Sequence, residues 1–595
     1  MPGMHETEPW VALGRVEELR GPGPFSAQAG REELVVVRVG SGFRAYEGRC
    51  PHQGALLGEG EIAGDELVCR NHGWRFDTAT GRRRGGSECL RSCAVEVRDG
   101  QLLARPGSLA AAAAAPARLR RVAELPGPRR LPIIGSRAVL DLERLHATME
   151  RWAERHGAAY QVHLGPNHVV VLSDPVLIQR GLRERPAVYR RIGTVEPVFR
   201  ELGIDGVFSA EGIEWRPLRR LAIEALSPGH LRSFYPTLRR VAERLRRRWS
   251  AAAEAGRTVD LEEDFKRFTV DVTTQLAFGH DLDTLEAEGD VLQRRLEHVF
   301  PGITRRLFAT MPLWRLVKLP AERRLEAAVA DVFVLLRGLL EQARAKLEAA
   351  PGAPPDTFLD AMILARDEEG RPFSDGQILG NAIEILVAGE DTTALTLTWA
   401  AHELCDAPGV MRALQEEADH ALGDASAPAD FEAAGRLEVA GAVTQETMRL
   451  RPVAPLIFLE TNVATTLGDL ELPAHQRLCF LMRPAALSPQ RFAGPGAFRP
   501  ERWLASGPAG AHDPGVLMPF GSGPRLCPGR ALALLEMRVA LATLARGFEL
   551  ERVGERRRVD ERFAFTMAPR GLRVRLRHRE ARADQAPGAV GAGAS

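Results

Sequence analysis

The sequence predicts a small all-β domain followed by a larger, mainly α-helical domain, and three observations support this prediction. The chain has 595 residues, which is too long for a single hydrophobic core. Residues 10 to 105 form short runs such as "ELVVVRVGSGFRAYEG" and "CAVEVRDGQLLAR", punctuated by Gly, Asp and Asn, a pattern typical of strands and turns. From about residue 123 onward the apolar residues recur at helical spacing instead.

Composition and charge are those of a folded protein without a nucleic-acid partner. The chain is 45% hydrophobic and 26% charged with a net charge of +1, and such a balance does not favour binding to a polyanion. No uninterrupted apolar window is long enough for a membrane span, and the start "MPGMHETEPW" lacks the pattern of a signal peptide. Seven cysteines, an odd number, do not predict a disulfide framework. We therefore expect a cytoplasmic protein with no membrane partner.

The source and the domain boundaries are also expectations from composition. Arginine far outnumbers lysine, and Ala and Gly are frequent, which favours a bacterial origin. The segment "RPGSLAAAAAAPARLRR" interrupts the strand pattern and predicts a linker. The expected organisation is a β domain at 1–106, a linker at 107–122, a helical domain at 123–580 and a disordered tail at 581–595. The oligomeric state is not predicted.

One predicted helix carries many arginines on its exposed side. The stretch "LRRVAERLRRRWSAAAEAG" places Val241, Leu245 and Trp249 on one apolar face beneath them. We interpret the arginine-rich side as a solvated surface, with docking of an acidic redox partner as the alternative.

Two Cys–His pairs lie in the predicted β domain. Cys50-x-His52 is followed, after sixteen residues, by Cys69-x-x-His72. Two such pairs on tight loops can hold a compact metal centre between them. The spacing by itself leaves open a Cys₂His₂ zinc site, a [2Fe–2S] cluster with one iron on the cysteines and one on the histidines, and a chance grouping of structural residues.

The residues around these pairs resemble the Rieske ferredoxin family. The stretches "CPHQGALLGEGEI" and "CRNHGWRFDTATG" match its two cluster loops, and the likeness covers nearly all of residues 10 to 105. The resemblance implies a Rieske [2Fe–2S] cluster that carries one electron at a time, with Cys50, His52, Cys69 and His72 as its ligands. Neither loop has the additional cysteine of respiratory-complex members, so the domain is similar to the ferredoxin and oxygenase branch.

A second cysteine motif, "FGSGPRLCPGR", lies near the other end of the chain. It places Cys527 in a glycine-rich loop just before a helical run. A helix N-terminus favours a thiolate, and the glycines let the backbone pass close to a flat ligand. The loop by itself also fits a buried structural cysteine in a turn.

The loop resembles the cysteine-ligand loop of the cytochrome P450 family, and the likeness extends over about residues 123 to 580. "ETMR" and "FRPERW" match the family's salt-bridge triad of Glu446, Arg449 and Arg502, and "WRPLR" matches its Trp-x-x-x-Arg helix. The resemblance implies a mainly α-helical prism with a small β region that binds haem b through Cys527. It places around the haem Arg525, Phe520, Gly521, Gly523, Gly529, Trp215, Arg219, Ala388 and Gly389.

The sequence departs from the family pattern at one place. Many members have an arginine after the Glu-x-x-Arg helix that reaches a haem propionate, but none lies between Pro452 and Ala474 here. The resemblance therefore leaves propionate pairing at that place open.

A long apolar run is interrupted by the polar stretch "AGEDTT". Such residues are costly in the middle of a helix unless they have a task. A bend capped by its own threonines is one interpretation. The family resemblance implies another, in which Gly389 and Thr392 form an oxygen-activation notch, and Asp391 and Thr392 form an acid–alcohol pair that relays protons. The presence of this pair implies O₂-dependent monooxygenation.

Together the motifs predict an O₂-dependent monooxygenase, a hydroxylase or epoxidase, with a fused Rieske electron donor. We see no flavin domain and no G-x-G-x-x-G fingerprint after a strand, so we expect an external NAD(P)H-dependent ferredoxin reductase, acting directly or through another ferredoxin. A hydrophobic small-molecule substrate is expected because the segments that line the substrate site in this family are apolar, namely 194–208, 452–458 and 563–567. The alternative is a redox or gas sensor in which cluster and haem act as reporters.

Overall fold

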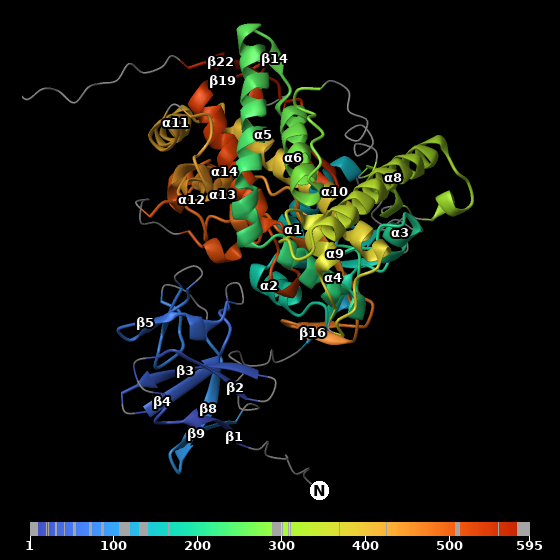
Figure 1. The fold of residues 1–595 in the computed structure, drawn as a ribbon. Helices are drawn as coiled ribbons and strands as arrows, with labels where there is room; N and C mark the ends of the chain where they lie inside the picture. Colours follow the sequence, from blue (N-terminus) through green and yellow to red (C-terminus); the bar gives the residue numbers. More distant parts are fainter. Residues whose placement is uncertain are drawn as a thin grey trace, which may run out of the picture. The chain divides into compact units, whose positions relative to one another are not determined.

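The computed structural model describes residues 10–19, 21, 23–29, 32–40, 42–51, 55–70, 74–84, 89–105, 119–129, 141–164, 167–287, 299, 301–307, 309, 311–367, 369–423, 425–505, 512–556 and 559–579. The described chain divides into two compact units, one containing the residues up to Arg120 and the other containing most of the remainder (Figure 1). Most of the predicted linker, the predicted tail at 581–595, His52 and His72 lie outside the described residues.

The N-terminal unit is built from antiparallel strands. A six-stranded sheet has the order β1-β9-β8-β4-β3-β2, and a three-stranded sheet has the order β5-β6-β7. The strands are β1 Val11–Arg15, β2 Phe25–Ala29, β3 Glu32–Val39, β4 Gly42–Glu47, β5 Glu61–Ala63, β6 Glu66–Val68, β7 Arg75–Asp77, β8 Ser92–Arg98 and β9 Gln101–Arg105. The predicted strand pattern between residues 10 and 105 is therefore observed.

Strand β3 divides the interior of this unit into two apolar clusters. Successive side chains on a strand point to opposite faces, so Val35 and Val37 enter one cluster while Leu34 and Val36 enter the other. The cluster on the Val35 side also contains Cys50 and Cys69. Both predicted cluster-ligand cysteines are therefore part of one core.

The second unit is mainly α-helical. Its helices are α1 Leu145–His156, α2 Pro175–Arg183, α3 Val195–Glu201, α4 Gly212–Ala225, α5 Pro228–Glu254, α6 Leu261–Phe278, α8 Pro320–Ala349, α9 Phe358–Leu364, α10 Asp375–Leu404, α11 Pro408–Leu422, α12 Phe431–Gly435, α13 Glu438–Leu450 and α14 Arg530–Gly547. Most of their buried residues belong to one extensive apolar core.

Small sheets accompany these helices. A five-stranded sheet has the order β11-β12-β18-β15-β13, a three-stranded sheet the order β14-β22-β19, and β20 and β21 form a hairpin. Their bounds are β11 Ala159–Leu164, β12 Asn167–Leu172, β13 Tyr189–Arg191, β14 Thr258–Val259, β15 Leu456–Thr461, β18 Arg477–Leu481, β19 Phe548–Arg552, β20 Asp560–Ala564, β21 Thr566–Arg570 and β22 Val574–His578; the remaining short strands are β10 Arg120–Arg121, β16 Thr465–Leu467 and β17 Leu470–Leu472.

Helix α10 is the central helix of this unit. It begins in a capping box, in which the Ser374 hydroxyl accepts from the Gln377 N–H and the Gln377 side chain accepts from the Ser374 N–H. Its 30 residues are mostly buried, and it packs against α6, α13 and α14 (Figure 1). The polar "AGEDTT" stretch therefore lies in the middle of the central helix of this unit.

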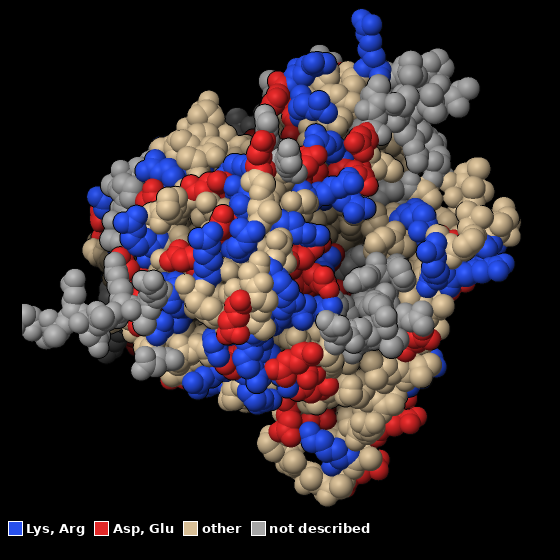
Figure 2. All heavy atoms as spheres, turned by 90° about the horizontal axis from the view of Figure 1, so that it is seen from above, with Lys and Arg blue, Asp and Glu red and all other residues tan. Residues whose placement is uncertain are grey.

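The arginine-rich side of α5 is offset by acidic neighbours. Arg244 pairs with Asp281 at 2.6 Å, Arg247 with Glu286 at 2.7 Å and Arg248 with Asp264 at 2.6 Å. On the face shown in Figure 2, basic and acidic side chains are interspersed over much of the surface. These contacts favour a solvated surface over a docking face for an acidic partner.

Within the described part of the chain, no helix combines the length and the apolar character that crossing a bilayer requires.

Candidate functional site

The loop that carries Cys527 is closed on itself just before α14. The Cys527 N–H donates to the Phe520 carbonyl at 2.9 Å, and Gly529 is the N-cap residue of α14. Gly521 and Gly523 have φ values of 78° and 70°, in the left-handed region that glycine adopts without strain. The glycines of the motif therefore shape a tight turn that presents one thiol at the start of a helix.

The Cys527 sulfur is in a setting suited to a metal-bound thiolate. Its side chain is exposed, yet desolvation by the surrounding protein raises the pKa of the thiol, while the backbone N–H of Gly529 and the Arg219 charge oppose that rise. The exposed side chain and the raised pKa are consistent with a thiol that solvent can reach but that protein atoms surround on most sides. Because a coordinated metal ion deprotonates a thiol outright, a bound iron would supply the stabilisation that the protein alone does not.

Helix α4 brings two further predicted residues to this region. Trp215 and Arg219 are four residues apart and share one face of the helix; Trp215 is buried. Burial lowers the pKa of the Arg219 guanidinium, and the nearby Cys527 opposes that shift. The Arg219 Nε is buried and makes no hydrogen bond within the described chain. A half-buried guanidinium with a buried, unbonded Nε calls for an anion, and a haem propionate fits it. Arg525 lies in the short 3₁₀ helix Gly523–Arg525.

The "AGEDTT" stretch of α10 has one open side and one tightly packed side. Ala388 is exposed in the middle of an otherwise mostly buried helix. A Cβ on Gly389 would lie 2.9 Å from the Thr273 Oγ1 of α6, so this glycine is required for the close approach of the two helices. The Thr392 hydroxyl donates to the Ala388 carbonyl at 3.0 Å, as in a locally bent helix. Gly389 therefore faces α6, whereas Ala388 and Thr392 lie toward the open side.

Among the described residues, the Asp391 carboxylate makes no hydrogen bond to the Thr392 hydroxyl. Its Oδ1 lies 3.3 Å from the Lys266 Nζ of α6, and its Oδ2 accepts from the Thr566 hydroxyl of β21 at 3.3 Å. Lys266 also pairs with Glu262 at 2.9 Å. Sequence reasoning missed both partners of Asp391. The sequence did contain one indication that Lys266 is a special position, since it is one of only three lysines in an arginine-rich chain.

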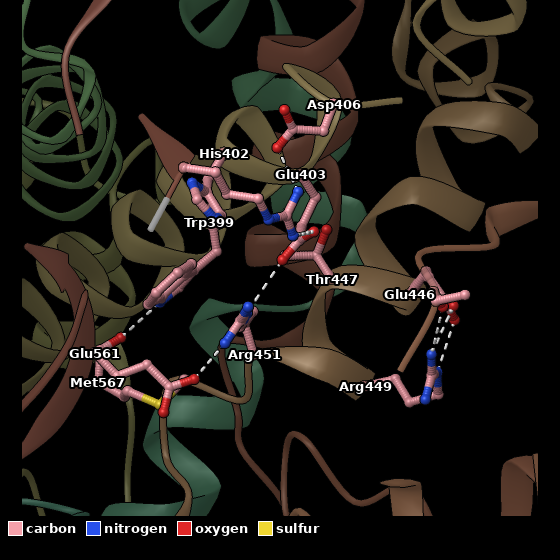
Figure 3. Close-up of polar contacts among 12 residues, drawn as sticks. Trp399, His402, Glu403, Asp406, Glu446, Thr447, Arg449, Arg451, Glu561 and Met567 are labelled. Atoms are coloured by element: carbon pink, nitrogen blue, oxygen red, sulfur yellow. Dashed lines mark hydrogen bonds and ion pairs between the residues drawn. The ribbon is translucent and has the colours of Figure 1, made fainter. Parts of the chain in front are cut away.

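The predicted salt-bridge triad is brought together in the interior. The two Glu446 oxygens accept from Arg449 at 2.8 and 2.9 Å, and the Arg502 Nε lies 3.2 Å from Glu446 Oε1. The Glu446–Arg449 pair is fully buried (Figure 3). Arg449 also donates to three backbone carbonyls, those of Ala486, Pro495 and Ala497. The triad thus ties α13 to the chain that leads toward the Cys527 loop.

No arginine follows the Glu-x-x-Arg helix between Pro452 and Ala474. The neighbouring Arg451 does not take over the role of a propionate-binding arginine. Arg451 is bound to Glu403 at 3.1 Å and also to Glu561, within a charged network next to α10 (Figure 3). This guanidinium is already neutralised by two carboxylates. The residues described here therefore give Arg219, rather than Arg451, as the cation available to an anionic cofactor.

In the N-terminal unit, Cys50 and Cys69 lie on two loops that are closed by backbone hydrogen bonds. The Cys50 N–H donates to the Ala55 carbonyl at 2.8 Å, and the Cys69 N–H donates to the Trp74 carbonyl at 2.8 Å. Each cysteine is 1% exposed, and neither is in a disulfide. Two buried thiols on adjoining loops of one core fit the cysteine side of a [2Fe–2S] cluster. The histidine side, His52 and His72, lies outside the described residues.

Comparisons with known proteins agree with this geometry. The cytochrome P450 family model matches residues 125–576, and the Rieske [2Fe-2S] domain model matches residues 9–94. The chain therefore belongs to the cytochrome P450 family and carries an N-terminal Rieske domain.

Curated relatives and a solved structure extend the comparison. The self-sufficient cytochrome P450 monooxygenase CYP505E5 of Aspergillus kawachii is 27% identical over 76% of this chain and 43% of its own length. The human mitochondrial 25-hydroxyvitamin D-1 alpha hydroxylase is 29% identical over 73% of this chain and 88% of its own. The crystal structure of the cytochrome P450DA heme domain covers 78% of this chain and 99% of its own at a TM-score of 0.69 and 22% identity. This chain thus spans less than half the length of the self-sufficient relatives.

These findings confirm several predictions made from the sequence. The fold class, an all-β Rieske region followed by a helical P450 fold, is confirmed. The P450 domain implies haem and the Rieske domain implies a [2Fe–2S] cluster, as predicted. A bacterial origin stays a prediction, since the relatives named above are fungal and human. The domain boundaries and the roles of the individual site residues also stay predictions.

Proposed function

We propose that this protein is an O₂-dependent monooxygenase, a hydroxylase or epoxidase, that inserts one oxygen atom into a hydrophobic small molecule. The observation that carries the proposal is the exposed Cys527 thiol at the N-terminus of α14, together with the nearby Arg219, whose buried Nε makes no hydrogen bond within the described chain. Cys527 would hold the haem iron, and Arg219, with Trp215 and Arg525, would bind the carboxylates of the haem. When bound, the haem supplies an iron centre that binds and reduces O₂, and the cluster supplies one-electron storage.

The residues of α10 would supply protons to this chemistry. Thr392 lies toward the open side of the helix next to Ala388, and its hydroxyl can hold a water or pass a proton at its Oγ1. Asp391 is the adjacent carboxylate, and Lys266 and Thr566 hold it by hydrogen bonds and charge. A proton donor next to an apolar helix face suits a reaction from which bulk water is excluded.

The Rieske domain would act as the electron donor within the chain. Monooxygenation consumes two electrons one at a time, and a tethered one-electron carrier has an effective concentration of up to about mM at its partner. We propose that electrons reach the cluster from an external NAD(P)H-dependent reductase, directly or through another ferredoxin. The relatives named monooxygenase and hydroxylase support the reaction class.

Aromatic side chains support a hydrophobic substrate. Phe208 lies 5.5 Å from Phe199 and 6.0 Å from Phe565 between ring centroids, so the segments 194–208 and 563–567 meet. Phe208 and Phe565 are both half-buried, so part of each residue is accessible to a ligand. An apolar aromatic surface of this kind favours apolar ligands.

The first test is spectroscopic and the second is enzymatic. The dithionite-reduced protein should give the red-shifted Soret band of a thiolate-bound haem in the presence of CO, and a Rieske-type EPR signal. NADPH consumption with a ferredoxin reductase should then depend on a hydrophobic substrate and should yield a product carrying one oxygen atom from ¹⁸O₂. NADPH consumption that no member of a substrate panel stimulates would instead support the sensor alternative.

Replacing Thr392 with alanine should separate electron use from product formation. We expect the product formed per NADPH consumed to fall by about 10²-fold, with the electrons appearing in hydrogen peroxide, because a positioned proton donor is lost. Thr398→Val is the matched control, since its hydroxyl bonds only to the Ala394 carbonyl of the same helix at 2.7 Å. Equal coupling in Thr392→Ala and Thr398→Val would argue against a role for Thr392.

Replacing Cys69 with serine should remove the cluster but leave the haem domain intact. The Rieske EPR signal should disappear, and NADPH-driven turnover should fall to the background rate while the Soret band is unchanged. Cys93→Ser is the control because this thiol is buried in the same domain and donates to the Arg105 carbonyl at 3.2 Å. Undiminished turnover in Cys69→Ser would show that electrons reach the haem without the cluster.

A further inference from the structure

Asp391 is restrained from two sides in this structure. Lys266 of α6 approaches one carboxylate oxygen, and the Thr566 hydroxyl of β21 donates to the other, each at 3.3 Å. Thr566 is 6% exposed, so no bulk water competes for this hydrogen bond. Both carboxylate oxygens are thus engaged by these two partners, and the Thr392 hydroxyl donates to the Ala388 carbonyl instead.

Thr566 follows directly on a strained turn. Ala564 pairs with Thr566 in the register of the β20–β21 hairpin, so the hairpin turns over the single residue Phe565. Phe565 has a φ of 75°, in the left-handed region that a bulky aromatic residue rarely adopts. Strain at such a position persists only when the surrounding contacts enforce it, and it marks a place where the chain can relax into a second arrangement.

The ring of Phe565 connects this turn to the aromatic residues of the segment 194–208. It meets Phe208 edge-on at 6.0 Å, and the Arg191 guanidinium covers Phe208 at 3.7 Å from the ring centroid. Phe208 and Phe565 are each half-buried, so both can contact an occupant of this region. A ligand that presses on Phe565 therefore acts one residue away from the Thr566 hydroxyl.

The hairpin is anchored immediately beyond Thr566. The Met567 carbonyl accepts from the Trp399 Nε1 of α10 at 3.0 Å (Figure 3). The Met567 N–H donates to the Val453 carbonyl at 2.8 Å. Movement of the tip is thus confined to Phe565 and Thr566, because the strand is fixed to α10 from the next residue onward. A small shift there is sufficient to break one hydrogen bond at 3.3 Å.

We propose that Thr566 is a positioning residue through which an apolar ligand in contact with Phe208 and Phe565 releases Asp391. With no ligand at the tip, Thr566 and Lys266 keep the carboxylate away from Thr392. When a ligand displaces Phe565, the Thr566 hydrogen bond to Oδ2 is lost, and this oxygen can turn toward Thr392 while Oδ1 keeps its contact with Lys266. Proton supply is thereby linked to the presence of a substrate. The inference rests on the proposed function in taking Asp391 as the proton source.

The test is infrared difference spectroscopy of the full-length holoprotein with 4-phenylimidazole, an aromatic ligand of haem iron. Addition of this probe should change a carboxylate stretching band that is absent from the Asp391→Asn variant. In Thr566→Val, the amplitude of this change should fall about tenfold, the factor expected when a hydrogen bond to a charged group no longer biases the equilibrium. Thr566→Ser, which keeps the hydroxyl, should restore it.

Two further variants separate this link from a general loss of structure. Phe565→Gly should still fold because glycine adopts a positive φ freely, yet it should lose the ligand-induced change, since the ring contact with Phe208 is gone. Thr398→Val removes a buried hydroxyl two turns further along α10 and should behave like the natural protein.

Two results would overturn the proposal. These are a full-size band change in Thr566→Val, and the lack of any Asp391-dependent band in the natural protein. The infrared measurement needs no turnover, so the link can fail in a protein that still inserts oxygen. A protein that shows the link but no substrate-dependent NADPH consumption would instead disprove the proposed function.

Discussion

Replacing Cys527 with serine should abolish oxygen insertion, the largest effect that we expect from any single substitution in this protein. Product formation should fall by about 10²- to 10³-fold or more, because a serine oxygen does not donate electron density to iron as a thiolate does. The direct measurement is the absorption spectrum of the reduced protein with CO. The red-shifted Soret band of a thiolate-bound haem should be absent in Cys527→Ser, while the Rieske EPR signal should be unchanged.

Cys405 provides a matched control for this experiment. It lies directly after α10, and burial raises the pKa of its thiol to about 11, so it is neutral near pH 7. Cys405→Ser should keep both the Soret band and the turnover of the natural protein. If Cys527→Ser retained the thiolate-type spectrum, Cys527 would not be the haem ligand, and the proposed function would lose its main support.

Replacing Glu446 with alanine should cause the largest loss of stability. Glu446 is fully buried and accepts hydrogen bonds from the Arg449 and Arg502 guanidinium groups, from the Trp503 Nε1 at 2.8 Å and from the Arg499 N–H at 2.8 Å. Its removal leaves two buried cations without their counter-charge. Breaking a buried pair in this way costs about 3–5 kcal/mol. Urea denaturation, followed by haem absorbance and tryptophan fluorescence, should show a correspondingly lower free energy of unfolding for the helical domain.

The exposed pair of Arg499 and Glu501 lies in the same stretch of chain and is the control. Their side chains are 41% and 42% exposed and 2.9 Å apart. Glu501→Gln should change the free energy of unfolding by no more than about 0.5 kcal/mol, since exposed ion pairs contribute little. A Glu446→Ala protein as stable as Glu501→Gln would show that the triad is not a structural support.

The local motifs could be read directly from the sequence. The Cys527 loop is a contiguous stretch in which Gly521 and Gly523 adopt the left-handed backbone of a tight turn, and each Cys–His pair spans at most four residues of sequence. Glu446 and Arg449 are one helical turn apart, so their pairing follows from helix geometry. Chemistry that depends on neighbouring residues in the chain is therefore predictable from residue types and spacing.

The direction of each side chain along α10 could not be read from the motif. Gly389 packs against Thr273 of α6, and Ala388 is the exposed residue of the stretch. Asp391 and Thr392 form hydrogen bonds with different partners, and the roles of Gly389, Asp391 and Thr392 in oxygen activation stay predictions. Adjacent residues on a helix point about 100° apart, so a motif written in letters does not say what each side chain faces.

The contacts that restrain Asp391 could be found only in the tertiary structure. Lys266 and Thr566 lie far from Asp391 along the chain, and Thr566 is 175 residues away. Each reaches Asp391 because α6 and β21 both pack on α10. The same holds for the arginines of α5, whose acidic partners Asp281 and Glu286 lie beyond α6. Sequence spacing specifies which side chains share one face of a helix or one loop. Which residue pairs with a charged side chain depends on how elements distant in the sequence pack together. A single sequence carries no local signal of that packing.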